Sequence, residues 1–165
     1  SHNRLFFIEV MGRDAGHIAL NSGVAAGAEE ILIPEENLGL ERLIQSLKRG
    51  QKTGKSSSFV VVGEGDKTGE NVFQLKEYVE KHLPNYDARV AVLGHMQRGG
   101  SPTCFDRVLA SRFGVNAVES LINGDNCCMV GLQNNKIKLT PFKKAIKGTT
   151  KINTELLKIS DIMSI

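Results

Sequence analysis

Short apolar runs alternate with amphipathic stretches along the chain. The runs are rich in β-branched residues, which is typical of strands buried on both faces. They lie at residues 5–10, 30–33, 58–63, 89–93 and 128–132, with a shorter one at 136–139. The stretches between them carry apolar residues three and four positions apart, which predicts helices. They lie at 14–26, 39–49, 70–82 and 103–122, and shorter ones begin at Thr140-Pro141 and near Asn153.

Strands that alternate with helices through short turns predict an α/β fold of three layers, a mostly parallel sheet with helices on both faces. The helix at 103–122 has one apolar face, which we expect to pack on the sheet. Its members are Phe105, Val108, Leu109, Val118, Leu121 and Ile122. The 165 residues are expected to form a single domain over 1–165, with 140–165 as a tail of helices. The chain lacks an initiator Met and enters a strand almost at once, so we expect a fragment of a longer, two-domain protein.

Composition narrows the function classes. The net charge is +3, but the cations are dispersed among 18 acids and there is no Trp, so nucleic acid is not an expected partner. No apolar run approaches the roughly 18 residues of a membrane span, and the N-terminus lacks the regions of a signal peptide. We therefore expect a cytoplasmic protein that does not contact membranes. Three cysteines, Cys104, Cys127 and Cys128, form neither a CxxC pair nor an even disulfide set, and are expected to be reduced.

The first candidate site is the turn from Gly94 to Pro102, which joins the strand at 89–93 to the next helix. It carries His95, Gln97 and Arg98 beside glycines that allow close approach of a ligand. In α/β folds, such turns form the ligand site at the carboxyl edge of the sheet. The chemistry suits a polar, phosphorylated metabolite, although a Gly-, Ser- and Pro-rich turn is often only structural.

A second turn of this kind runs from Met11 to Gly16. It precedes a helix whose free N–H groups and positive dipole end are expected to favour an anion. Arg13 adds a guanidinium suited to phosphate or carboxylate, with pairing to Asp14 as the alternative. The strand at 58–63 ends in Glu64, a carboxylate that can accept bonds from sugar hydroxyls or lie in a solvated turn. Together the three turns predict a sugar-phosphate site.

Long motifs in these turns resemble the carboxyl-terminal half of bacterial-type 6-phosphofructokinases. The motifs are Glu9-Val-Met-Gly-Arg13, Pro34-Glu35, Glu64 at its strand end, and the segment from Arg89 through Pro102 to Asp106-Arg107. The resemblance runs from Arg4 to Ile146. It implies the phosphofructokinase-type fold and an enzyme of glycolysis that uses MgATP to phosphorylate the 1-hydroxyl of fructose 6-phosphate.

The resemblance also implies roles for individual residues. His95 and Arg98 would hold the 6-phosphate, Glu64 would accept sugar hydroxyls, and Arg13 would neutralise charge at the transferring phosphoryl group as the catalytic residue. The implied substrate-binding set is Arg4, Met11, Gly12, Arg13, Glu64, Arg89, His95, Met96, Gln97 and Arg98.

Arg4 and Arg89 are predicted at the opposite ends of their strands from the other site residues. Seven residues of strand put Arg4 on the order of 20 Å from Met11. The resemblance implies that these arginines complete the site of a neighbouring subunit in a homo-oligomer, expected to be a tetramer. The alternative is that both are solvated strand-end charges.

A second, allosteric site is implied at the other edge of the sheet. The loop after residue 50 mimics a P-loop, but its glycines enclose three residues where that pattern needs four. The resemblance implies that the region binds an effector, ADP or phosphoenolpyruvate, with Gly27 and Glu29 near its magnesium ion. The implied residues are Gly27, Ala28, Glu29, Thr53, Lys55, Ser56 and Ser57. Thr53 replaces a second Lys of many relatives, and a flexible Lys/Ser loop is the alternative.

Two family segments have no match in the chain: the glycine-rich ATP-binding segments and the segment that supplies the catalytic base. The resemblance implies that ATP, and Mg²⁺ with it, bind mainly through that other half. We therefore expect the chain alone to be inactive and no catalytic metal site within it. Three alternatives stay open: a pyrophosphate-dependent phosphofructokinase, a non-catalytic sugar-phosphate or effector-binding module, and an assembly module that presents a two-fold surface.

Overall fold

The computed structural model describes residues 3–52, 57–148 and 151–163. The chain divides into two compact units, where the sequence analysis expects a single domain. Unit 1 comprises Ser1–Gly99 with Ile152–Ile165, and unit 2 comprises Gly100–Lys151.

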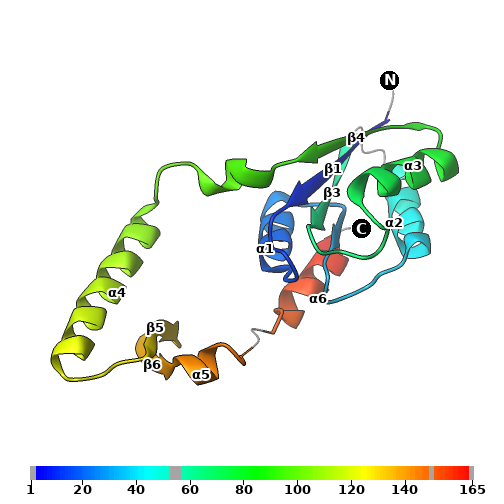
Figure 1. Cartoon of the computed structure of the whole chain (residues 1–165). Helices are drawn as coiled ribbons and strands as arrows, with labels where there is room; N and C mark the ends of the chain where they lie inside the picture. Colours follow the sequence, from blue (N-terminus) through cyan, green and yellow to red (C-terminus); the bar gives the residue numbers. More distant parts are fainter. Residues whose placement is uncertain (1–2, 53–56, 149–150, 164–165) are drawn as a thin grey trace. The chain divides into compact units, whose positions relative to one another are not determined.

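Unit 1 is built on a four-stranded parallel sheet (Figure 1). Its strands are β1 (Asn3–Val10), β2 (Glu30–Leu32), β3 (Ser57–Gly63) and β4 (Tyr86–Val92), in the order β2-β3-β1-β4. Because β1 lies between β3 and β4, the carboxyl ends of these three strands share one edge. The predicted parallel sheet is confirmed.

Helices cover both faces of this sheet, as predicted. On one face, α2 (Leu40–Lys52) and α3 (Val72–His82) enclose Leu5 and Phe7, whose side chains are fully buried. On the other face, α1 (His17–Ala26) and α6 (Thr154–Met163) pack over Val10 and Ile31. The alternation along β1 follows from the strand period of two, which sends successive side chains to opposite faces.

Unit 2 contains α4 (Cys104–Ile122), β5 (Cys128–Gln133), β6 (Lys136–Pro141) and α5 (Phe142–Ala145). The two strands form an antiparallel hairpin rather than part of the parallel sheet. Asn134 and Asn135 form its turn with φ of 49° and 59°, a geometry that suits Asn in two-residue hairpins. The short tail elements expected after residue 140 are α5 and α6.

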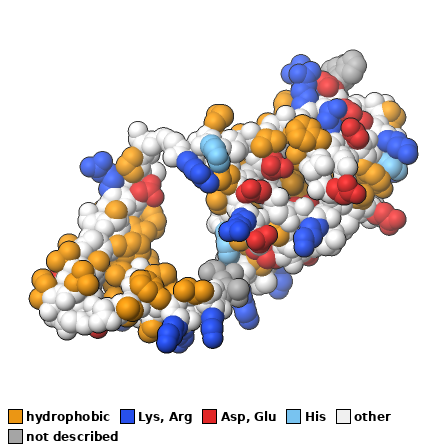
Figure 2. Space-filling model, viewed as in Figure 1, with side chains coloured by type: hydrophobic (Ala, Val, Ile, Leu, Met, Phe, Trp, Pro, Cys, Tyr) orange, Lys and Arg blue, Asp and Glu red, His pale blue; other side chains and the backbone are white. Residues whose placement is uncertain are grey.

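The helix after Pro102 is α4, and it belongs to unit 2, whereas the parallel sheet belongs to unit 1. A capping box between Thr103 and Asp106 begins α4, but none of its residues is buried. Phe105 and Ile122 are 69% and 78% exposed, and Figure 2 shows hydrophobic side chains gathered over α4 and the hairpin. Within unit 2, α4 contacts β5 and β6, and these contacts leave none of the α4 residues buried. Among the helices of residues 3–52, 57–148 and 151–163, none has the length and apolar character of a membrane-spanning segment.

Candidate functional site

Side chains from two other loops hold the turn that follows β1. The Met11 backbone N–H donates to Gln97 Oε1 at 2.7 Å. The backbone N–H groups of Gly12 and Arg13 donate to Glu64 Oε2 at 3.3 and 3.0 Å. Gln97 lies in a 3-10 helix, η1 (Gly94–Arg98), and Glu64 directly follows β3. The structure thus brings together the three turns that the sequence analysis selected.

The close approach of Gly65 to the backbone of Arg13 makes this arrangement possible. A Cβ at Gly65 would meet the Arg13 carbonyl oxygen far inside the 3.0 Å that real Cβ atoms keep. Arg13 itself has φ of 54°, in the left-handed region that non-glycine residues rarely adopt. The loop after β3 therefore rests directly on a strained turn after β1. Sequence reasoning missed Gly65, which is signalled only by its place beside Glu64.

The electrostatics of the site centre on Glu64. Backbone hydrogen bonds from Arg13 and then Gly12 lower the pKa of its carboxyl, and the charges of Arg98 and Arg13 lower it further. Glu64 is therefore ionised at neutral pH. Because both backbone bonds end on Oε2, Oε1 can accept a hydrogen bond from a ligand hydroxyl.

The cations of the site face solvent. Arg13 Nε lies 3.9 Å from Asp14 Oδ2, and both side chains are more than 90% exposed. Exposed pairs at this distance contribute little, so the predicted alternative of an Arg13–Asp14 pair leaves the guanidinium accessible to a ligand. His95, Met96 and Arg98 are also exposed on η1.

One of the N–H groups that the sequence analysis expects to be free at the start of α1 is bonded within the chain. Gly16, the N-cap of α1, donates its N–H to both carboxylate oxygens of Glu35 at 3.0 Å. A carboxylate of the chain itself therefore occupies the positive end of this helix. Glu35 belongs to the Pro34-Glu35 motif, but its contact with a residue 19 positions away gave no signal in the sequence.

The structure separates Arg4 and Arg89 from the rest of the site. Arg4 lies near the amino end of β1. Arg89 is the fourth of seven residues in β4, so its predicted place at the strand end is wrong because β4 begins earlier, at Tyr86. Arg89 is level with Phe6, which puts both arginines on one face of the sheet. The Arg89 guanidinium also pairs with Asp87 at 3.2 Å.

Three of the predicted effector residues adjoin the end of α1. Gly27 is exposed with φ of 73° and ends the helix. Ala28 and Glu29 are buried, and the Glu29 carboxylate lies against Gly50 of α2, because a Cβ there would lie 2.5 Å from Glu29 Oε1. Thr53, Lys55 and Ser56 lie outside the described residues, as does the side chain of Ser57, whose backbone begins β3.

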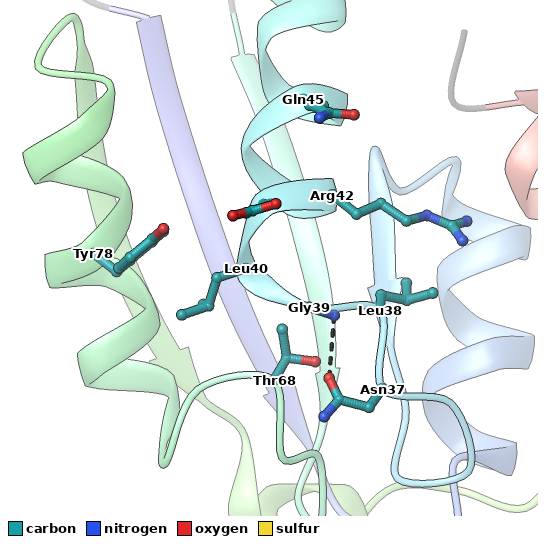
Figure 3. Close-up of a pocket in the computed structure, with 9 residues that line it drawn as sticks. Asn37, Leu38, Gly39, Leu40, Arg42, Gln45, Thr68 and Tyr78 are labelled. Atoms are coloured by element: carbon teal, nitrogen blue, oxygen red, sulfur yellow. Dashed lines mark hydrogen bonds between the residues drawn. The ribbon is translucent and has the colours of Figure 1, made fainter.

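A cavity of about 670 Å³ opens between α2 and α3 (Figure 3). It is lined by Asn37, Leu38, Gly39, Leu40, Glu41, Arg42, Gln45, Thr68 and Tyr78. Asn37 Oδ1 accepts the Gly39 N–H at 3.1 Å, and Arg42 pairs with Asp161 of α6 at 2.7 Å. None of the predicted site residues lines this cavity. It is therefore distinct from the site formed by the three turns.

Comparisons with known proteins agree with the resemblance. The chain is 48% identical over its whole length to ATP-dependent 6-phosphofructokinase 1 of Thermus thermophilus, of which it covers 51%. It is 44% identical to ATP-dependent 6-phosphofructokinase 2 of Bacteroides thetaiotaomicron, of which it covers 50%. The chain thus spans about half the length of the curated relatives that it matches.

Solved structures give the same fold. The phosphofructokinase of Pichia pastoris in the T-state matches 99% of this chain, and the chain covers 18% of it, with a TM-score of 0.80 and 30% identity. The pyrophosphate-dependent phosphofructokinase of Marinobacter aquaeolei matches 94% of this chain, which covers 43% of it, with a TM-score of 0.78. The latter is 23% identical and bears on the fold alone. The predicted phosphofructokinase-type fold is confirmed.

A family-wide comparison extends beyond single relatives. The model of the family described as phosphofructokinase matches residues 1–121, well over half of the chain. This range includes β1 to β4, the three turns and most of α4. The chain belongs to the phosphofructokinase family.

Proposed function

We propose that this chain is the fructose 6-phosphate-binding half of an ATP-dependent 6-phosphofructokinase. The whole enzyme transfers the γ-phosphoryl group of ATP to the 1-hydroxyl of fructose 6-phosphate. The observation that carries this proposal is the convergence of three turns, in which Glu64 and Gln97 hold the backbone of Met11 to Arg13. A carboxylate for hydroxyls and exposed cations for a phosphate then lie in one unit, as a sugar phosphate requires.

The charges suggest a division of roles in binding. His95 and Arg98 of η1 bind the 6-phosphate, and Arg98 lies near enough to Glu64 to lower its pKa. Met11, Gly12, Met96 and Gln97 form the wall around the sugar. Since Glu64 is ionised, it acts as an acceptor for sugar hydroxyls and orients the ring.

Arg13 is the proposed catalytic residue of this half. Phosphoryl transfer depends mainly on positioning and on stabilisation of charge around the transferring group. The Arg13 side chain is more than 90% exposed, and its exposed pair with Asp14 at 3.9 Å contributes little, so the guanidinium is accessible to that group. The chain alone is expected to show no kinase activity, because the segments that would bind ATP and supply the base belong to the other half.

The names of relatives that are 44–48% identical support ATP rather than pyrophosphate as the donor. ATP carries Mg²⁺ in such reactions, and the ion would bind mainly through the other half. Within the described ranges, no group of three or more His, Cys, Asp or Glu side chains could hold a metal.

We further propose a cytoplasmic homotetramer with an effector site. Arg4 and Arg89 share a sheet face away from the turn at Met11, so they fit the site of a neighbouring subunit better than their own. Gly27, Ala28 and Glu29, with the loop that includes Thr53, Lys55, Ser56 and Ser57, would bind ADP or phosphoenolpyruvate, with Mg²⁺ near Gly27 and Glu29.

Calorimetric titration with fructose 6-phosphate tests the proposed binding role. We expect the chain to bind fructose 6-phosphate but not fructose, and Arg98→Ala to abolish binding. Arg112→Ala is the matched control, because Arg112 lies in unit 2, where it donates to Asn135. The titration is repeated at rising protein concentration, so that Arg4 and Arg89 of neighbouring chains can contribute. No binding at any concentration, or equal binding by Arg98→Ala, would contradict the proposal.

A further inference from the structure

Glu35 links the loop after β2 to the turn after β1. Both of its carboxylate oxygens lie 3.0 Å from the backbone nitrogen of Gly16. Glu35 follows Ile33 and Pro34, and a backbone bridge between Ile33 and Glu36 closes this short loop. The carboxylate is thus presented by a constrained loop to the first N–H group of α1.

Gly16 provides no cap of its own for this helix. It is buried, and a Cβ at this position would lie 2.5 Å from Ile33 and 2.8 Å from Glu35 Oε2. The first turn of α1 also contains no acidic residue. Helices usually obtain a hydrogen-bond acceptor and negative charge at this end from an N-cap or first-turn side chain. Here Glu35, which is remote in sequence, supplies both.

Three side chains therefore hold the turn from Met11 to Gly16. Gln97 holds its beginning, Glu64 holds its middle and Glu35 holds its end. Between them, Arg13 adopts a left-handed backbone conformation with φ of 54°. Such a conformation persists only where the surroundings determine it on several sides.

Glu35 differs from the other two side chains in its place. Glu64 keeps Oε1 for a ligand, and Gln97 lies in η1 with the exposed His95 and Arg98. Both oxygens of Glu35, in contrast, lie against the N–H of Gly16 at the start of α1. We propose that Glu35 is a positioning residue, which anchors the end of the turn so that Arg13 keeps its place beside Glu64 when the sugar phosphate binds. The role of the turn in binding the sugar phosphate rests on the proposed function. The anchoring of the turn by Glu35 does not.

The same contact bears on specificity. A free N-terminus of α1 would attract a phosphate by its N–H groups and its dipole. With the Glu35 carboxylate in that place, a second anion is repelled from the helix end. The phosphate of the ligand is directed instead to the exposed cations of η1.

Backbone amide exchange tests the anchoring in the absence of ligand. In Glu35→Ala, we expect the amides of Gly12, Arg13 and Gly16 to exchange about tenfold faster, which corresponds to the loss of one charge-assisted hydrogen bond. Glu35→Gln keeps an acceptor oxygen and should restore much of the protection. Glu36→Ala is the matched control. It removes a neighbouring carboxylate but keeps the backbone hydrogen bond from Glu36 to Ile33, which is 3.2 Å long. Unchanged exchange in Glu35→Ala, or equally faster exchange throughout unit 1, would overturn the proposal.

Steady-state kinetics of the full-length enzyme test whether Glu35 supports the binding of fructose 6-phosphate. Glu35→Ala should raise the KM for fructose 6-phosphate by about tenfold while the KM for ATP stays unchanged, and Glu35→Gln should lie between. Equal changes in both KM values, or none, would overturn the positioning role. Failure of the unmodified protein to bind fructose 6-phosphate would instead refute the proposed function, and the exchange measurement would still decide the anchoring.

Discussion

Gly65→Ala is the sharpest test of how the site is assembled. Gly65 follows Glu64, and an added Cβ would press on the Arg13 carbonyl oxygen and lie 3.1 Å from Pro34 Cγ. Both neighbours belong to loops and not to flexible side chain ends, so the backbone has to move. The variant therefore separates the loop after β3 from the turn after β1 without changing any group that would touch the ligand.

The size of the effect follows from the contacts. To restore the 3.0 Å that Cβ atoms require, the Arg13 carbonyl must move by more than about half an ångström. The bond from Gly12 to Glu64 is 3.3 Å long, so such a shift takes it beyond the hydrogen-bond range. Overpacking of this kind costs about 1–3 kcal/mol of unfolding free energy, which lowers the melting temperature by roughly 2–12 °C.

Calorimetry and thermal unfolding measure the two consequences. We expect fructose 6-phosphate to bind at least about tenfold more weakly to Gly65→Ala. Gly114→Ala is the control, because Gly114 lies in α4 of unit 2 and a Cβ there would meet nothing within 4 Å. Unchanged binding by Gly65→Ala would refute the inference that contact between the two loops holds the site together.

Three further predictions concern stability. Asn71→Ala should lower the unfolding free energy in urea by about 1 kcal/mol, because Asn71 Oδ1 caps α3 by accepting from Phe73 and Gln74 at 3.0 Å; an unchanged midpoint would contradict this. Burial raises the pKa of Glu30 above its ordinary 4.5, so the folded chain retains a proton that the unfolded chain releases. The stability contribution is full below 4.5 and is lost as pH rises through the raised value, and Glu30→Gln should flatten a thermal unfolding series across that range. Amides of α4 should exchange much faster than those of β1 and β3, because α4 has no buried residue; equal protection by mass spectrometry would refute that reading.

The sheet could be predicted from sequence because its signal is local. The run Phe59 to Val62 is continuously apolar and contains three β-branched valines, as is typical of a strand covered on both faces. The surroundings of α4 could not be predicted in the same way. The spacing of Phe105 and Val108 reveals an apolar face, but not what covers it, and the structure leaves this face exposed.

Some residues of the candidate site could be predicted from the sequence, and others could not. Arg13, Glu64 and Gln97 follow parallel strands, so the rule that such strand ends share an edge was enough to group them. Glu35 could not be grouped, since an acidic residue in a loop is usually solvated and its partner, Gly16, carries no side chain. The offset of Arg89 from the strand end was missed because Tyr86-Asp87 contributes little apolar pattern to β4.

We propose that the sugar phosphate binds at the three turns and not in the cavity between α2 and α3. Amide exchange mapped before and after addition of saturating fructose 6-phosphate tests it most directly. We expect new protection at Gly12, Arg13 and the η1 segment Gly94–Arg98, with none at Thr68 or Tyr78 in the cavity between α2 and α3. Protection at that cavity, with the three turns unchanged, would contradict it.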